Sequence, residues 1–139
     1  KTSGVSGGDS TSGINVRTLN TVISNTISGA SLASNILTLT AGTYDFEASA
    51  PTRDTTGGAS RLALYNHTDS LDILVGHNAN PTANSPTPTA IVSGRFSIPT
   101  SKSVKLNHLI TNARVGGLGV AASTGQSEVY AELRIWRIA

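Results

Sequence analysis

The amino-acid sequence predicts an all-β domain, and three observations support this fold class. The 139 residues include 18 Ser, 18 Thr, 10 Asn and 14 Gly, a composition that favours strands and turns, because Ser, Thr and Asn compete with helical hydrogen bonds and β-branched residues pack well on a pleated surface. Short apolar runs are separated by Gly, Pro, Asn or Asp at intervals of about ten residues, as in sandwiches and barrels. Several of these runs also alternate between apolar and polar residues, which is the period of a half-buried strand.

Eight intervals have the length and composition of strands. They are residues 14 to 20, 35 to 39, 42 to 50, 60 to 67, 71 to 77, 90 to 98, 103 to 111 and 127 to 138. Alternation is clear in 42 to 50, where Tyr44 and Phe46 share a face, and in 103 to 111, where Leu106 and His108 share one. Eight strands are the number that a jelly roll requires, so we expect a two-sheet antiparallel jelly-roll sandwich.

The final interval, 127 to 138, is expected at the centre of the fold and has two unlike faces. One face carries only apolar residues: Val129, Ala131, Leu133 and Ile135. The other face mixes aromatic, charged and apolar residues: Tyr130, Glu132, Arg134, Trp136 and Ile138. A mixed face of this kind is typical of a protein interface. The alternative is that Trp136 folds over the sheet edge onto its own core.

The chain has room for one domain with a flexible lead-in. Residues 1–13 are rich in Gly, Ser and Thr, and we expect them to be a flexible linker from an upstream stalk, with the head domain at 14–139. The absence of Met even at position 1 indicates that the sequence is the C-terminal piece of a longer chain. Long loops are expected at 51 to 59, 78 to 89 and 112 to 126, and loops of this length often carry function.

Composition argues against several partners and cofactors. The formal net charge is +2 and the ten Lys and Arg are scattered singly, whereas nucleic-acid binding needs a basic patch. There is no Cys and no apolar run long enough to span a membrane. The three His residues lack the close spacing of a metal site, and His108 is expected to be a hydrogen-bonded core residue. We therefore expect no cofactor and no metal.

Two short segments match catalytic or cofactor-binding motifs, but the secondary structure that these motifs need is not predicted around them. Residues 4–8 match the nucleophile-elbow pattern and residues 117–122 match a dinucleotide fingerprint, but neither has the strand and helix that such motifs need. Asp45 and Glu47 lie about 7 Å apart by strand rise, a separation found in any alternating strand. We expect a domain that presents a surface and is not an enzyme.

Several segments together resemble a known family. They are residues 32 to 51, with Ala41-Gly-Thr-Tyr44 and Ala48-Ser-Ala-Pro51 as the most specific parts, then Leu64-Tyr-Asn66 within 61 to 69, Gly94-Arg-Phe96, Gly119-Val-Ala121 and residues 128 to 132. This pattern resembles the C-terminal head domains of bacteriophage tail fibres and tailspikes, which are similar in layout to the trimeric jelly rolls of the tumour necrosis factor and complement globular-head class.

The resemblance implies a homotrimer whose last strand is central in the inner sheet. It also implies a receptor-binding role at the distal end of the fibre, attaching the virion to a bacterial capsule or lipopolysaccharide glycan, with carbohydrate binding in the loops. The best ligand-binding candidates are Arg53, Asp54, His77, Asn78, Asn80, Asn84 and Arg114. The trimer interface is expected at Tyr130, Glu132, Arg134 and Trp136.

Two other roles remain open. The domain is alternatively a trimerisation and folding cap of a fibre or depolymerase, without a ligand of its own. A capsule-cleaving activity, if present, is expected in the upstream part of the protein.

Overall fold

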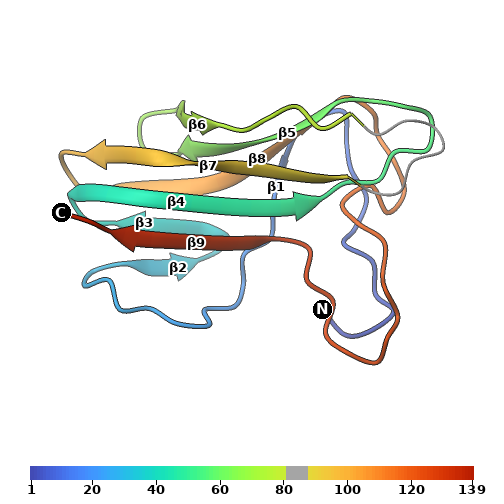
Figure 1. Cartoon of the computed structure of the whole chain (residues 1–139), viewed down its shortest axis with the longest axis horizontal. Helices are drawn as coiled ribbons and strands as arrows, with labels where there is room; N and C mark the ends of the chain where they lie inside the picture. Colours follow the sequence, from blue (N-terminus) through green and yellow to red (C-terminus); the bar gives the residue numbers. More distant parts are fainter. Residues whose placement is uncertain (81–87) are drawn as a thin grey trace.

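The computed structural model describes residues 1–80 and 88–139, and in these residues it is all-β (Figure 1). The strands are β1 (Gly13–Val16), β2 (Ser31–Ala33), β3 (Ile36–Leu39), β4 (Gly42–Pro51), β5 (Ser60–Asn66), β6 (Leu71–Val75), β7 (Thr89–Ile98), β8 (Lys102–Ile110) and β9 (Glu132–Arg137). Each of the eight predicted intervals overlaps one of them, and β2 is an addition. Within the described ranges, no helix is long and apolar enough to cross a membrane.

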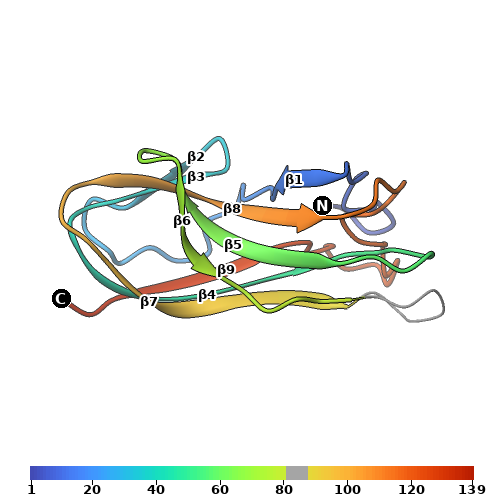
Figure 2. The same cartoon turned by 90° about the horizontal axis from the view of Figure 1, so that it is seen from above.

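The strands form two antiparallel sheets stacked face to face (Figure 2). One sheet has the order β2-β3-β8-β5-β6, with β1 also paired to β8, and the other has the order β7-β4-β9. β3 pairs with the first residues of β8 and β1 with the last four, so the two short strands share one edge of β8.

Three strand pairs are nested inside one another along the chain. β5 pairs with β6, β4 pairs with β7, and β3 pairs with β8. The chain therefore follows the path of one long hairpin whose closing turn joins β5 to β6. Successive pairs along this hairpin lie alternately in the larger and the smaller sheet.

The core lies between the sheets and follows from the alternation in the sequence. In β4, Tyr44, Phe46, Ala48 and Ala50 are buried, while Asp45 and Glu47 point outward. The ring of Phe96 on β7 stacks on Tyr44 at 5.6 Å between centroids and meets Phe46 edge-on at 6.4 Å. β5 and β8 face this cluster with Leu62, Leu64, Val104 and Leu106, all fully buried.

The last strand was predicted at the centre of the fold, and this prediction is wrong. β9 begins only at Glu132 and lies at the edge of the smaller sheet, paired with β4. Residues 127 to 131 belong to a loop because the Glu128 carboxylate accepts hydrogen bonds from the backbone N–H groups of Gly4, Ala122 and Ser123, at 2.8–3.1 Å. This loop places Val129, expected in the core, 69% exposed to solvent.

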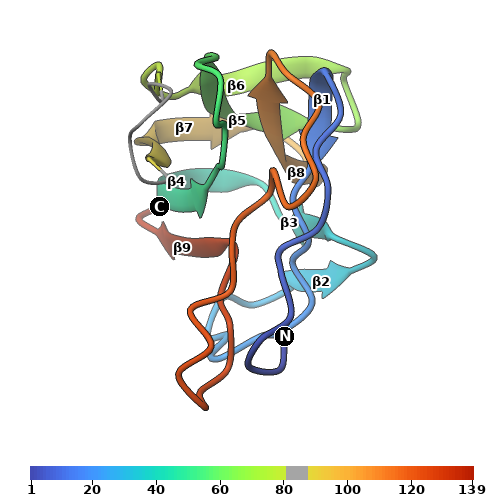
Figure 3. The ribbon, with the colours of Figure 1, turned by 90° about the vertical axis from the view of Figure 1, so that its right-hand side faces the viewer.

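The first residues of the chain lie against this same loop (Figure 3). Gly7 donates its N–H to the carbonyl of Gly119 at 2.9 Å, and Ser10 and Arg114 exchange backbone hydrogen bonds at 2.9 and 3.1 Å. Gly119 has a φ of +126°, and a Cβ there would lie 2.5 Å from the Tyr130 ring, so the close approach requires glycine. The domain boundary at residue 13 stays a prediction.

Candidate binding surfaces

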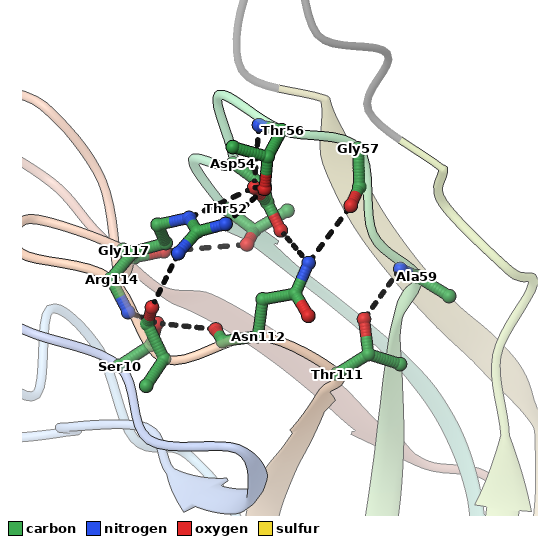
Figure 4. Close-up of polar contacts among 11 residues, drawn as sticks. Ser10, Thr52, Asp54, Thr56, Gly57, Ala59, Thr111, Asn112, Arg114 and Gly117 are labelled. Atoms are coloured by element: carbon green, nitrogen blue, oxygen red, sulfur yellow. Dashed lines mark hydrogen bonds and ion pairs between the residues drawn. The ribbon is translucent and has the colours of Figure 1, made fainter.

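The first candidate surface is the end of the sandwich where the β4–β5 and β8–β9 loops meet the N-terminal segment. Its centre is Asp54, which is 5% exposed (Figure 4). The two carboxylate oxygens accept four hydrogen bonds: from the N–H and hydroxyl of Thr56 at 2.9 and 3.1 Å, from Arg114 Nε at 3.0 Å, and from Asn112 Nδ2 at 2.7 Å.

These partners connect three segments that are distant in sequence. Arg114 also donates from Nη2 to the Thr56 hydroxyl, and its backbone N–H donates to Ser10 Oγ at 3.1 Å. Asn112 donates to the carbonyl of Gly57 at 2.8 Å, and its own carbonyl accepts from Ser10 Oγ at 3.2 Å. The loops at this end are therefore held together by partly buried hydrogen bonds, of which those to Asp54 are charge-assisted.

The environment of Asp54 keeps it ionised. Desolvation raises its pKa, but the hydrogen bonds from Thr56, Asn112 and Arg114 together outweigh burial and lower the pKa to about 2. Because four protein hydrogen bonds already engage the two carboxylate oxygens, we interpret Asp54 and Arg114 as groups that shape the surface, with ligand contact left to their more exposed neighbours.

Of the predicted ligand-binding residues, the structure brings Arg53, Asp54 and Arg114 together. Arg53 is exposed, and its backbone N–H donates to Gly117 at 3.0 Å, so its side chain projects from the fixed part of the loop. His77, Asn78 and Asn80 are exposed in the loop that follows β6. Asn84 lies outside the described residues.

The predicted trimer-interface residues divide into two groups. Glu132, Arg134 and Trp136 share the outward face of β9, as expected from alternation. Tyr130 lies instead in the β8–β9 loop, where its hydroxyl donates to the carbonyl of Val5 at 2.8 Å. Tyr130 is separated from the other three because the strand begins only at Glu132.

Sequence reasoning did not identify the role of Arg17, which is the most buried charge in the protein at 2% exposure. Its Nη2 donates to the carbonyls of Pro51 at 3.2 Å, Leu118 at 2.9 Å and Tyr130. Burial lowers its pKa to about 10, so it stays protonated at neutral pH. The only available signal was its place two residues after Asn15, because alternation continued past the end of β1 would point both side chains inward.

His108 confirms one half of its prediction and corrects the other. It is fully buried, as expected. However, neither ring nitrogen has a hydrogen-bond partner within residues 1–80 and 88–139. Desolvation, with the nearby charge of Arg17, lowers its pKa to about 3, so the ring is a neutral core group.

The second candidate surface is the outward face of the β7-β4-β9 sheet. Trp136, Asp45 and Arg95 form one row across the three strands, because Asp45 is the cross-strand partner of both other residues. Arg95 Nε and Nη2 donate to the two carboxylate oxygens of Asp45 at 2.8 and 2.9 Å. The hydrogen bonds from Arg95 lower the pKa of Asp45, which is therefore an ion-paired carboxylate.

Two hollows border β9. One, of about 380 Å³, is lined by residues 26–28 and 135–137, where the segment before β2 passes the edge strand. The other, of about 120 Å³, lies over Glu47, Ser49, Glu132 and Arg134 on the outward face. The described residues contain no group of three or more His, Cys, Asp or Glu side chains arranged to hold a metal ion.

The comparisons with known proteins do not assign the chain to a family: no protein-family model matches it, and no curated protein matches its sequence.

Proposed function

We propose that this domain is the receptor-binding head of a bacteriophage tail fibre, and that it attaches the virion to a glycan of the bacterial surface. The observation that carries the proposal is the loop end of the sandwich, where the buried Asp54 network holds exposed polar residues in one arrangement. A surface ordered before binding loses less conformational entropy when it meets a ligand. This favours recognition of a partner as its role.

The finer architecture that we propose is a jelly roll. The nested pairs β5–β6, β4–β7 and β3–β8 support it, because a jelly roll is a long antiparallel hairpin rolled into two sheets. The next pair in this series would join the segment before β2 to β9. Residues 26–28 pass beside β9 at this place without forming a strand.

We also propose that the domain is a homotrimer, so that three weak sites act together by avidity. The larger sheet carries an apolar outward pair: Ile14 of β1 and Leu109 of β8 are direct cross-strand partners and are 62% and 40% exposed. Adjacent apolar side chains in solvent mark association surfaces. An interface at Glu132, Arg134 and Trp136 stays a second prediction.

The test of the proposed function is competition with the virus. We expect the domain to bind host cells and their extracted surface glycan, and to block phage adsorption. Arg53→Ala and Asn78→Ala remove exposed loop groups without touching the Asp54 network, and binding should weaken if the loops contact the glycan. A domain that binds neither cells nor glycan, and leaves adsorption unchanged, rules the proposal out.

The alternative role, a trimerisation and folding cap, is favoured by the same exposed pair Ile14 and Leu109. Deleting the domain from the full-length fibre separates the two roles. Misassembled fibres indicate a cap, whereas correctly assembled trimers that no longer adsorb indicate a receptor-binding head.

A further inference from the structure

The outward face of the β7-β4-β9 sheet combines features that the loop end does not have. Trp136, the only tryptophan of the chain, is 52% exposed. Beside it in the same row is the Asp45–Arg95 ion pair, whose side chains keep 42% and 64% of their surface in solvent. In the next row of β4 and β7, the hydroxyls of Thr43 and Ser97 are hydrogen-bonded to each other at 2.8 Å.

The ion pair has spare hydrogen-bonding capacity on the solvent side. A carboxylate offers about four acceptor sites and a guanidinium five N–H donors. Within the described part of the chain, Asp45 and Arg95 use two of each on one another. The bidentate geometry also holds the guanidinium and the carboxylate coplanar in one orientation. Their remaining donors and acceptors therefore face solvent, and a ligand that binds them causes little further loss of side-chain entropy.

Trp136 borders a hollow at the edge of β9 as well as the Asp45–Arg95 ion pair. The hollow of about 380 Å³ is bordered by Trp136, Arg137, Thr26 and Ser28. Its volume is near the lower end of small-molecule sites, roughly 300 to 1,000 Å³. Its lining combines Trp136 with two isoleucines, Ile27 and Ile135, two hydroxyl residues and the cation of Arg137.

This combination favours a sugar over a protein partner. The centre of a protein interface is apolar and poor in charge. Trp136 has an exposed apolar neighbour in Ile138, but its row continues into the Asp45–Arg95 ion pair and the next row carries the hydroxyls of Thr43 and Ser97. The exposed apolar pair, Ile14 and Leu109, is on the other sheet. A pyranose ring has a C–H face that packs on an indole and a rim of hydroxyls that both donate and accept, so it matches an aromatic plane next to a carboxylate–guanidinium pair.

We propose that the outward face of β9 and β4 around Trp136 is a pyranose-binding site, in which the indole stacks on one sugar ring and the Asp45–Arg95 pair binds its hydroxyls. The inference rests on the proposed glycan-binding function and moves the principal contact from the loops to the sheet. Arg137, Thr26 and Ser28 then line the position of the adjoining sugar unit.

The single tryptophan makes the test direct, because all indole fluorescence of the protein comes from Trp136. An array of bacterial capsular and lipopolysaccharide-core oligosaccharides identifies a bound glycan, which is then titrated against the wild-type domain. We expect a saturable change in Trp136 emission and protection from acrylamide quenching. In calorimetry, Trp136→Ala should weaken binding by about tenfold to a hundredfold, since stacking and buried aromatic area are both lost.

Three variants distinguish the possible sites. Trp136→Phe keeps an aromatic plane and should retain most of the affinity, while Asp45→Asn keeps the shape and should lose part of it. Asp72→Asn makes the same change at an exposed position of β6 in the other sheet, so it is the matched control and should bind as the wild type does. Circular dichroism and melting temperature check that each variant is folded.

The outcomes separate this inference from the proposed function. A glycan that binds with unchanged emission, and equally well to Trp136→Ala, overturns the sheet site and leaves the receptor-binding head standing. A domain that binds no oligosaccharide on the array and no host cells overturns both. Emission already protected from acrylamide without glycan, and released by dilution, overturns the sheet site in favour of Trp136 as a contact between protomers.

Discussion

Replacing Asp54 with alanine tests whether the loop end is held by one buried carboxylate. The variant removes four hydrogen bonds, two of them from Asn112 and Arg114, and leaves those donors in a partly buried place. Hydrogen bonds to a charged group contribute about 1.5 to 3 kcal/mol each, but solvent replaces some of them because the Arg114 side chain is 31% exposed. We therefore expect the free energy of unfolding to fall by roughly 2 to 4 kcal/mol.

The pH dependence gives a second, independent magnitude for the same group. The pKa of Asp54 is lowered from 3.8 to about 2 in the folded state. A depressed carboxylate pKa contributes stability above the unfolded value and loses it as pH falls through the folded value. This part of the stabilisation, at most about 2 kcal/mol, is present above pH 4 and disappears between about pH 4 and pH 2.

The assay is urea unfolding at fixed protein concentration from pH 7 to pH 2, comparing wild type with Asp54→Ala. The difference between the two should be largest at neutral pH and shrink toward pH 2. Asp45→Ala is the matched control: it also removes the carboxylate partner of an arginine, but from an exposed pair, so a far smaller change is expected. Equal urea midpoints for wild type and Asp54→Ala at pH 7 would refute the reasoning.

Three further predictions concern the buried charge, the buried imidazole and self-association. Arg17→Met should destabilise the domain strongly and increase protease cleavage in the 111 to 131 loop, because three carbonyls lose their donor; intact loops under limited proteolysis would contradict this. His108 has a folded pKa of about 3, below its unfolded value of 6.5, so protonation favours the unfolded state and stability falls as pH drops below 6.5. His108→Leu should flatten that slope between pH 6.5 and pH 4 in thermal melts; an unchanged slope would count against a neutral core histidine. For self-association, light scattering should give three times the 14.2 kDa chain mass, and Ile14→Lys should lower it to one; a monomeric wild type at high concentration would exclude the trimer.

The fold class and several core positions are readable from the sequence alone. Alternation with a period of two fixes which side chains can share a face, so Tyr44, Phe46, Leu106 and His108 were predicted inward and are buried. Strand positions were also predicted well, because Gly, Pro and Asn interrupt the apolar runs at the turns. These are local properties, readable within about ten residues.

The position of the last strand and the meeting of distant polar residues depend on the tertiary structure. Alternation continues through residues 127 to 131, but Glu128 binds the N–H groups of Gly4, Ala122 and Ser123, and these contacts keep the segment out of the sheet. Asp54 and Arg114 are 60 residues apart and meet because two loops leave the same end of the sandwich. Likewise, Trp136, Asp45 and Arg95 form one row only after three distant strands pair in register. Such long-range pairing depends on the whole chain, so local pattern cannot specify it.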